Sequence, residues 1–114
     1  MQIRVPETIS LKQGETRMFT FPSRYGDLQG FVIRYRDALH AYENKCLHWP
    51  IPLDFGDGEF YYEKIDRIVC KNHGAEYDPA TGICDAGPCQ GEALTRFPVI
   101  LDGGDALVTV PEPE

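Results

Sequence analysis

Two short cysteine-histidine pairs are the residues of this chain best suited to chemistry. One pair is Cys46 and His48, separated by one residue, and the other is Cys70 and His73, separated by two. Together they supply two thiolates and two imidazoles, which iron and zinc both accept as ligands in proteins. The pairs therefore predict a metal site that is built by two loops distant in the sequence.

The order of these ligands favours an iron-sulfur cluster over a single zinc ion. Zinc sites with mixed ligands usually keep the cysteines in one pair and the histidines in another, whereas each pair here holds one of each. In a Rieske centre two cysteines hold one iron and two histidines hold the other, so each loop delivers one ligand to each metal. A zinc site made by the same residues and a chance grouping of thiols and histidines are the alternatives.

The sequence around the second pair resembles the cluster-binding segment of Rieske-type ferredoxins. The resemblance runs from roughly Gly30 to Val110 and includes, besides the two pairs, HGAEYD at 73–78, Thr81-Gly82 and Gly87-Pro88. One departure is the stretch of 21 residues between His48 and Cys70, which is longer than the family's usual gap. We interpret residues 53–62 as an inserted hairpin.

The resemblance implies a cofactor, its ligands and a function. The cofactor is a [2Fe-2S] cluster, with Cys46 and Cys70 on the buried iron and His48 and His73 on the outer iron. The function is that of a soluble one-electron carrier between a reductase and an oxygenase or another oxidoreductase, with no bond chemistry of its own. The alternatives are a small Rieske subunit of a larger reductase or oxygenase complex, and a zinc-stabilised structural module.

Four further residues are assigned by the resemblance or left open. High-potential members carry a serine and a tyrosine two and four residues after the second histidine, where this chain has Ala75 and Tyr77. We therefore expect a potential in the lower or middle part of the family's range, with Tyr77 either a donor to sulfur or an ordinary core aromatic. Cys84 and Cys89 bracket the expected third loop, either as two thiols or as a disulfide. Cluster ligation by one of them is a third possibility, against which stands that the four ligand positions of the family are already filled.

Size and charge exclude several classes of function. A chain of 114 residues predicts one Rieske domain over 1–114, with a cluster-binding subdomain at about 45–91. It leaves no room for a second catalytic domain, and His40 is the one histidine outside the pairs, which we expect at the surface or the edge of the core. The 18 acidic and 11 basic residues give a net charge of −7, which argues against binding of nucleic acid. The acidity either favours a basic protein partner or serves only to keep the protein soluble.

The pattern of apolar residues predicts strands throughout and no long amphipathic helix. The expected strands are 2–5, 16–21, 31–35, 38–43, 60–63, 66–70, 75–77, 83–85, 94–101 and 106–110, with turns at 25–27, 55–58, 78–82 and 102–105. Many short strands indicate an all-β fold of stacked antiparallel sheets, a sandwich or barrel. The Rieske resemblance implies the same fold, with the ligands on loops.

The N-terminal residues carry no apolar segment of the length a signal peptide needs. No run in the sequence approaches the roughly 20 apolar residues of a membrane span. We therefore expect a cytoplasmic protein that does not bind membranes; the oligomeric state is left open.

Overall fold

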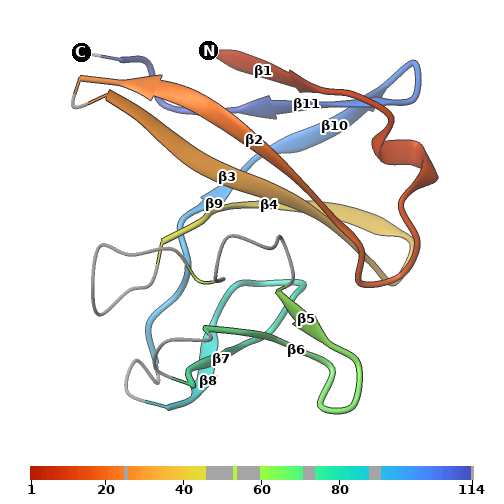
Figure 1. The fold of residues 1–114 in the computed structure, drawn as a ribbon, viewed down its shortest axis with the longest axis vertical. Coiled ribbons are helices and arrows are strands. Elements are labelled where there is room, and N and C mark those ends of the chain that lie inside the picture. Colours follow the sequence, from red (N-terminus) through yellow and green to blue (C-terminus); the bar gives the residue numbers. More distant parts are fainter. Residues whose placement is uncertain (25, 46–52, 54–59, 71–73, 88–90, 114) are drawn as a thin grey trace.

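The computed structural model describes residues 1–24, 26–45, 53, 60–70, 74–87 and 91–113. Within these residues almost all regular structure is antiparallel strand, and the one helical element is a short 3-10 helix, η1 (Thr8–Ser10). Figure 1 shows the strands in stacked layers. The predicted all-β class with stacked antiparallel sheets is confirmed. None of the helical structure in the described part of the chain has the length and apolar character to cross a bilayer.

Three sheets make up the fold. The first contains, in spatial order, β1 (Gln2–Val5), β11 (Asp105–Thr109) and β10 (Val99–Asp102). The middle sheet contains β2 (Thr16–Ser23), β3 (Gly26–Tyr35), β4 (Ala38–Glu43) and β9 (Arg96–Phe97). The third contains β5 (Tyr61–Tyr62), β6 (Arg67–Val69), β7 (Glu76–Tyr77) and β8 (Cys84–Ala86). In Figure 1 the third sheet lies at the opposite end of the molecule from the two termini.

The middle sheet is buried on both faces, because successive side chains of a strand point to opposite sides. Val32 and Ala41 face the core shared with the first sheet, whereas Phe31, Ile33 and Tyr42 face the core shared with the third. A strand between two cores needs consecutive apolar residues rather than an alternating pattern. The run Phe31-Val32-Ile33 on β3 meets that need, and all three side chains are fully buried.

The predicted strands recur in the structure with some shifted boundaries. β1 and β4 have the expected bounds, but β3 begins at Gly26 instead of residue 31, because the register with β2 continues to the pair Ser23 and Gly26. The turn expected at 25–27 is therefore wrong in placement, since 26 and 27 are already paired. The single strand expected at 94–101 is two strands, β9 and β10, on either side of Pro98. β9 pairs with β4 and β10 with β11, so the chain changes sheets at this proline.

Two of the predicted turns are confirmed. Asp102 and Asp105 pair across the β10–β11 hairpin, and Gly103 and Gly104 between them both have positive φ, as a tight two-residue hairpin requires. In the β7–β8 turn the Asp78 carboxylate accepts a hydrogen bond of 2.8 Å from the amide of Ala80. The turn at 55–58 and residues 54–59 of the expected inserted hairpin lie outside the described residues.

An aromatic contact joins the third sheet to the middle one. The rings of Phe31 on β3 and Phe60 before β5 are stacked, with centroids 4.1 Å apart and planes inclined by 12°. Stacked aromatic pairs of this kind stabilise a core beyond the area they bury. The third sheet, in which Cys70 directly follows the inner strand β6, is thus packed on a rigid support.

Candidate metal centre

Of the four predicted ligands, Cys70 lies within the described residues, whereas Cys46, His48 and His73 lie outside them. Cys70 directly follows β6 and its side chain is fully buried. A thiol at the end of a packed strand has few alternative positions, which suits a ligand to a buried iron. In the described residues no three metal-ligating side chains come together, which is expected when three members of the set fall outside them.

Two backbone hydrogen bonds close the base of the segment that begins at Cys70. The amide of Cys70 donates to the carbonyl oxygen of Ala75 at 2.9 Å, and the amide of Gly74 donates to the carbonyl oxygen of Cys70 at 2.7 Å. Gly74 has a φ of +71°, a conformation that glycine adopts at no steric cost. The chain before and after residues 71–73, which include the predicted ligand His73, is therefore fixed.

The segment that carries the first predicted pair is closed by a side chain. The Oδ1 atom of Asn44 accepts a hydrogen bond of 2.8 Å from the amide of Leu53. Asn44 is itself held in place, because its backbone amide donates to the backbone carbonyl oxygen of Gln29 at 2.9 Å. Asn44 and Leu53 are both buried and stand on either side of residues 45–52. The predicted ligands Cys46 and His48 belong to this bracketed segment.

The base of the expected third loop is closed by backbone hydrogen bonds. The amide of Cys84 on β8 donates to the backbone carbonyl oxygen of Glu92 at 2.7 Å. The carbonyl oxygen of Cys84 accepts a hydrogen bond of 3.0 Å from the amide of Gly91. The Cys84 thiol donates to the carbonyl oxygen of Ala86 at 3.3 Å. Cys89 lies outside the described residues, so the choice between two thiols and a disulfide stays a prediction.

The three loop bases meet in one core. Leu53, Cys70, Ala75, Cys84 and Leu94 are buried members of the same apolar cluster. A Cβ atom at Gly87 would lie 2.8 Å from the Cα of Ala75, so the third loop touches the second directly. The structure therefore places the ends of all three predicted loops side by side, as a centre shared between two ligand loops requires.

Two predictions about other residues can be compared with the structure. Tyr77 is fully buried in the core that contains Cys70, so its aromatic ring packs as a core residue; a hydrogen bond to a cluster sulfur stays a prediction. His40 is half-buried on β4, as expected for the edge of the core. Burial, and then the nearby Arg96, lower the pKa of His40.

The donor set fits an iron-sulfur cluster as far as it is described. A buried thiol beside an apolar core is the environment expected for the cysteine-bound iron, which is shielded from water. Sequence reasoning missed Asn44 and Asp66, whose polar side chains tie loops to the sheets. The sequence signal for Asn44 is an asparagine two residues before a predicted ligand pair, whereas no local signal marks Asp66.

The chain is similar to a known protein family and to several solved structures. The family model described as Rieske [2Fe-2S] domain matches residues 2–108. A search of the curated proteins finds no significant match.

Three solved structures are similar over nearly the whole chain. The ferredoxin of carbazole 1,9a-dioxygenase from Nocardioides aromaticivorans IC177 is 27% identical, with 100% of this chain and 99% of that chain covered and a TM-score of 0.71. A chain in the complex of reduced oxygenase and oxidized ferredoxin in carbazole 1,9a-dioxygenase is 28% identical, covering 94% and 91%, with a TM-score of 0.69. The ferredoxin of Sphingomonas yanoikuyae B1, at 24% identity, coverage of 97% and 100% and a TM-score of 0.67, shares the fold.

Proposed function

The chain belongs to the Rieske [2Fe-2S] domain family, and from that premise we propose that it carries single electrons from a reductase to an oxygenase or a similar oxidoreductase. Its cofactor is a [2Fe-2S] cluster. The observation that carries the proposal is the end-to-end similarity to the ferredoxin of carbazole 1,9a-dioxygenase, with no large part of either chain left over. In this proposal the domain transfers electrons and leaves bond chemistry to its partner.

We assign the cluster to four ligands, Cys46 and Cys70 on one iron and His48 and His73 on the other. We also treat residues 1–114 as one domain, with a cluster-binding subdomain at about 45–91. The closed bases of the loops that flank these ligands support both assignments, because they lie together on one buried core. When bound, the cluster accepts and returns one electron, and the chain's part is to hold it and to keep water from its buried side.

The first experiment is metal analysis of protein prepared without oxygen. Iron and acid-labile sulfide in equal amounts, with the electron paramagnetic resonance (EPR) signal of a reduced Rieske centre, are the expected result. Substituting Cys70→Ser or His73→Gln should abolish the signal. Cys84→Ser and His40→Gln are the matched controls, since they remove a buried thiol and a histidine that we do not assign as ligands. Loss of the signal in a control variant, or zinc in place of iron, would contradict the assignment.

The second experiment tests whether electrons must pass through this protein. A reductase, this protein and an oxygenase, each purified from the native host, should form product only when all three are present. The net charge of −7 supports a basic docking surface on the partner, so the rate should fall as ionic strength rises. Product formation without this protein would count against the carrier role.

We also propose a cytoplasmic location, where reductases that use soluble cofactors would meet it. Fractionation of the native host, with an antibody against the protein, tests this. Recovery in a periplasmic or membrane fraction would contradict it.

A further inference from the structure

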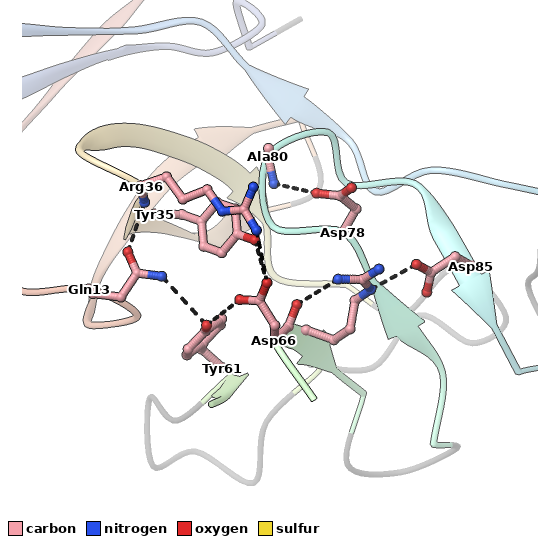
Figure 2. Close-up of polar contacts among 9 residues, drawn as sticks. Gln13, Tyr35, Arg36, Tyr61, Asp66, Asp78, Ala80 and Asp85 are labelled. Atoms are coloured by element: carbon pink, nitrogen blue, oxygen red, sulfur yellow. Dashed lines mark hydrogen bonds and ion pairs between the residues drawn. The ribbon is translucent and has the colours of Figure 1, made fainter. Parts of the chain in front are cut away.

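Asp66, in the turn between β5 and β6, joins the third sheet to the middle one. Its carboxylate accepts hydrogen bonds from the hydroxyls of Tyr35, at 2.7 Å, and Tyr61, and it pairs with the guanidinium of Arg36 at 3.3 Å. Figure 2 shows these donors converging on the one carboxylate. Tyr35 ends β3 of the middle sheet, whereas Tyr61 is on β5. One side chain thus holds two sheets together.

Gln13 completes a circuit of contacts around Asp66. Its Nε2 lies 3.5 Å from the hydroxyl of Tyr61, and its Oε1 accepts a hydrogen bond of 2.8 Å from the amide of Arg36. The rings of Tyr35 and Tyr61 also meet edge to face, with centroids 6.0 Å apart. A closed circuit restricts each member more than a single contact does.

The backbone at this junction has positive φ angles in both turns. Arg36, Asp37 and Asp66 have φ values of 49°, 64° and 55°, and among the described non-glycine residues one other, Glu7, has a positive φ. Such conformations persist where surrounding contacts enforce them, and they cluster at functional sites. The φ values of Arg36 and Asp37 are those that the two-residue β3–β4 hairpin requires, because Tyr35 pairs with Ala38. The contacts made to Asp66 join this hairpin to the β5–β6 turn.

A polar pocket of about 390 Å³ lies on this side of the junction. It lies between the β3–β4 hairpin, β6 and the β7–β8 turn, and its lining includes Arg36, His40, Arg67 and Asp78. The Phe31–Phe60 stack, by contrast, belongs to the buried core. Tyr35 and Arg36, which contact Asp66, also line this pocket.

The network continues from Asp66 toward the metal centre. Arg67 donates to the carbonyl oxygen of Asp66 at 2.8 Å, and its Nε donates to the carboxylate of Asp85 on β8 at 2.7 Å (Figure 2). β6 leads from Arg67 to Cys70, and β8 leads from Asp85 to Gly87, which touches Ala75. The hydrogen bonds of Arg67 therefore connect Asp66 to β6 and β8, the two strands that lead to the predicted site.

We propose that Asp66 is a positioning residue for the cluster, which fixes β6 and, through Arg67, β8 against the middle sheet. The proposal rests on the proposed function, since it concerns the placement of Cys70 and of the Gly87 loop around the cofactor. Without the Asp66 contacts the third sheet keeps its aromatic core but is free to shift at its outer edge. The cluster should then be held in a wider range of geometries and lose iron more readily.

The test variant is Asp66→Asn, which keeps the size of the side chain and one acceptor oxygen. Its NH2 group cannot accept a hydrogen bond from the second phenol, and the charge that attracts Arg36 is lost. Tyr61→Phe is a second variant that removes one donor only. The matched control is Asp105→Asn, because Asp105 also accepts two hydrogen bonds, from the amide of Glu7 at 2.9 Å and from Arg4 at 3.1 Å, but within the first sheet.

Two measurements on the cluster-loaded proteins separate positioning from general stability. Asp66→Asn should lose iron to a chelator about tenfold faster than the wild type, the factor expected for loss of one hydrogen bond to a charged group. Its reduced EPR signal should also be broadened, with Tyr61→Phe intermediate. Asp105→Asn should match the wild type in both. Equal behaviour of the Asp66 and Asp105 variants would overturn the proposal.

Hydrogen exchange separates this proposal from the proposed function. The amide of Val69 on β6 donates to the carbonyl oxygen of Phe60 at 2.9 Å and reports opening of the β5–β6 hairpin. Its exchange should be about tenfold faster in Asp66→Asn and unchanged in Asp105→Asn. A wild-type protein that binds no cluster would refute the proposed function, and unchanged Val69 exchange in Asp66→Asn would refute the positioning role.

Discussion

The hydroxyl of Tyr42 on β4 donates a hydrogen bond of 2.8 Å to the carbonyl oxygen of Pro79 in the β7–β8 turn. Tyr42 is fully buried, so this bond joins the middle sheet to the third inside the core. Gly82 lies against the same ring, since a Cβ there would be 2.7 Å from its Cε1. The turn that follows β7 therefore packs against the side chain of Tyr42.

Tyr42→Phe should destabilise the protein without removing the cluster. The ring remains, but the carbonyl of Pro79 loses its buried donor, which costs about 1–3 kcal/mol. Urea titration of the cluster-loaded protein measures the loss in free energy of unfolding. Tyr62→Phe is the control, because Tyr62 is exposed on β5. Equal stability of the two variants would show that the bond to Pro79 contributes nothing.

The same residue predicts a loss of stability at high pH. Burial raises the pKa of Tyr42 to about 12, whereas an unfolded tyrosine titrates near 10. Between these values the folded protein keeps a proton that the unfolded chain has lost, so stability present below about pH 10 is lost as pH rises toward about 12. In this window wild type should lose about 1.4 kcal/mol more per pH unit than Tyr42→Phe. Parallel stability curves from urea titrations at several pH values would contradict the prediction.

Sequence alone predicted most strands because turns and apolar runs mark them locally. β1 and β4 are each followed closely by turn-forming residues, and their bounds were predicted as observed. The N-terminal half of β3 was missed because residues 26–29 are exposed, and they are strand only through pairing with β2. The change of sheets at Pro98 depends on partners far along the chain, which no local pattern encodes.

The residues of the site likewise fall into those that the sequence predicts and those that it does not. Ligand type and order are local properties, so Cys70 and its companions could be named from the sequence. Asp66 could not, because its partners Tyr35 and Arg36 lie 31 and 30 residues away and the function of its carboxylate depends on the fold that brings them together. Asn44 lies close to a ligand pair, but its contact with Leu53 spans the loop that the pair occupies.

Asn44→Ala should weaken the first ligand loop. The buried amide of Leu53 would lose its acceptor, which costs about 1–3 kcal/mol and releases the ends of residues 45–52. We expect lower iron content after purification and faster loss of iron to a chelator. Asn44→Asp keeps an acceptor oxygen for Leu53 and should retain more iron. If both variants bound iron as the wild type does, the Asn44 bond would not be needed to hold the loop.

Gly14→Ala tests the space that Tyr61 occupies. Gly14 has a φ of +79°, and a Cβ there would lie 2.3 Å from the Cδ2 of Tyr61, so the ring must move from its present position. Gly103→Ala is the control, since Gly103 also has a positive φ but nothing within 4 Å. The control should lose about 1 kcal/mol of stability and Gly14→Ala clearly more. Thermal unfolding of the two variants measures the difference, and equal losses would mean that Tyr61 moves at no cost.

Gly87→Ala should damage the metal centre itself. A Cβ at Gly87 would lie 2.8 Å from the backbone Cα of Ala75, which cannot rotate away as a flexible side chain would, so the third loop must move off the second. Gly91→Ala is matched to it, with a φ of +93° against +99° and open space around the new methyl group. Both variants therefore carry the same backbone penalty, and only the first displaces a loop base. We expect Gly87→Ala to lose most of its iron and sulfide and Gly91→Ala to keep both. Metal analysis and the visible spectrum measure the difference. Full loading of Gly87→Ala would show that the contact with Ala75 does not shape the centre.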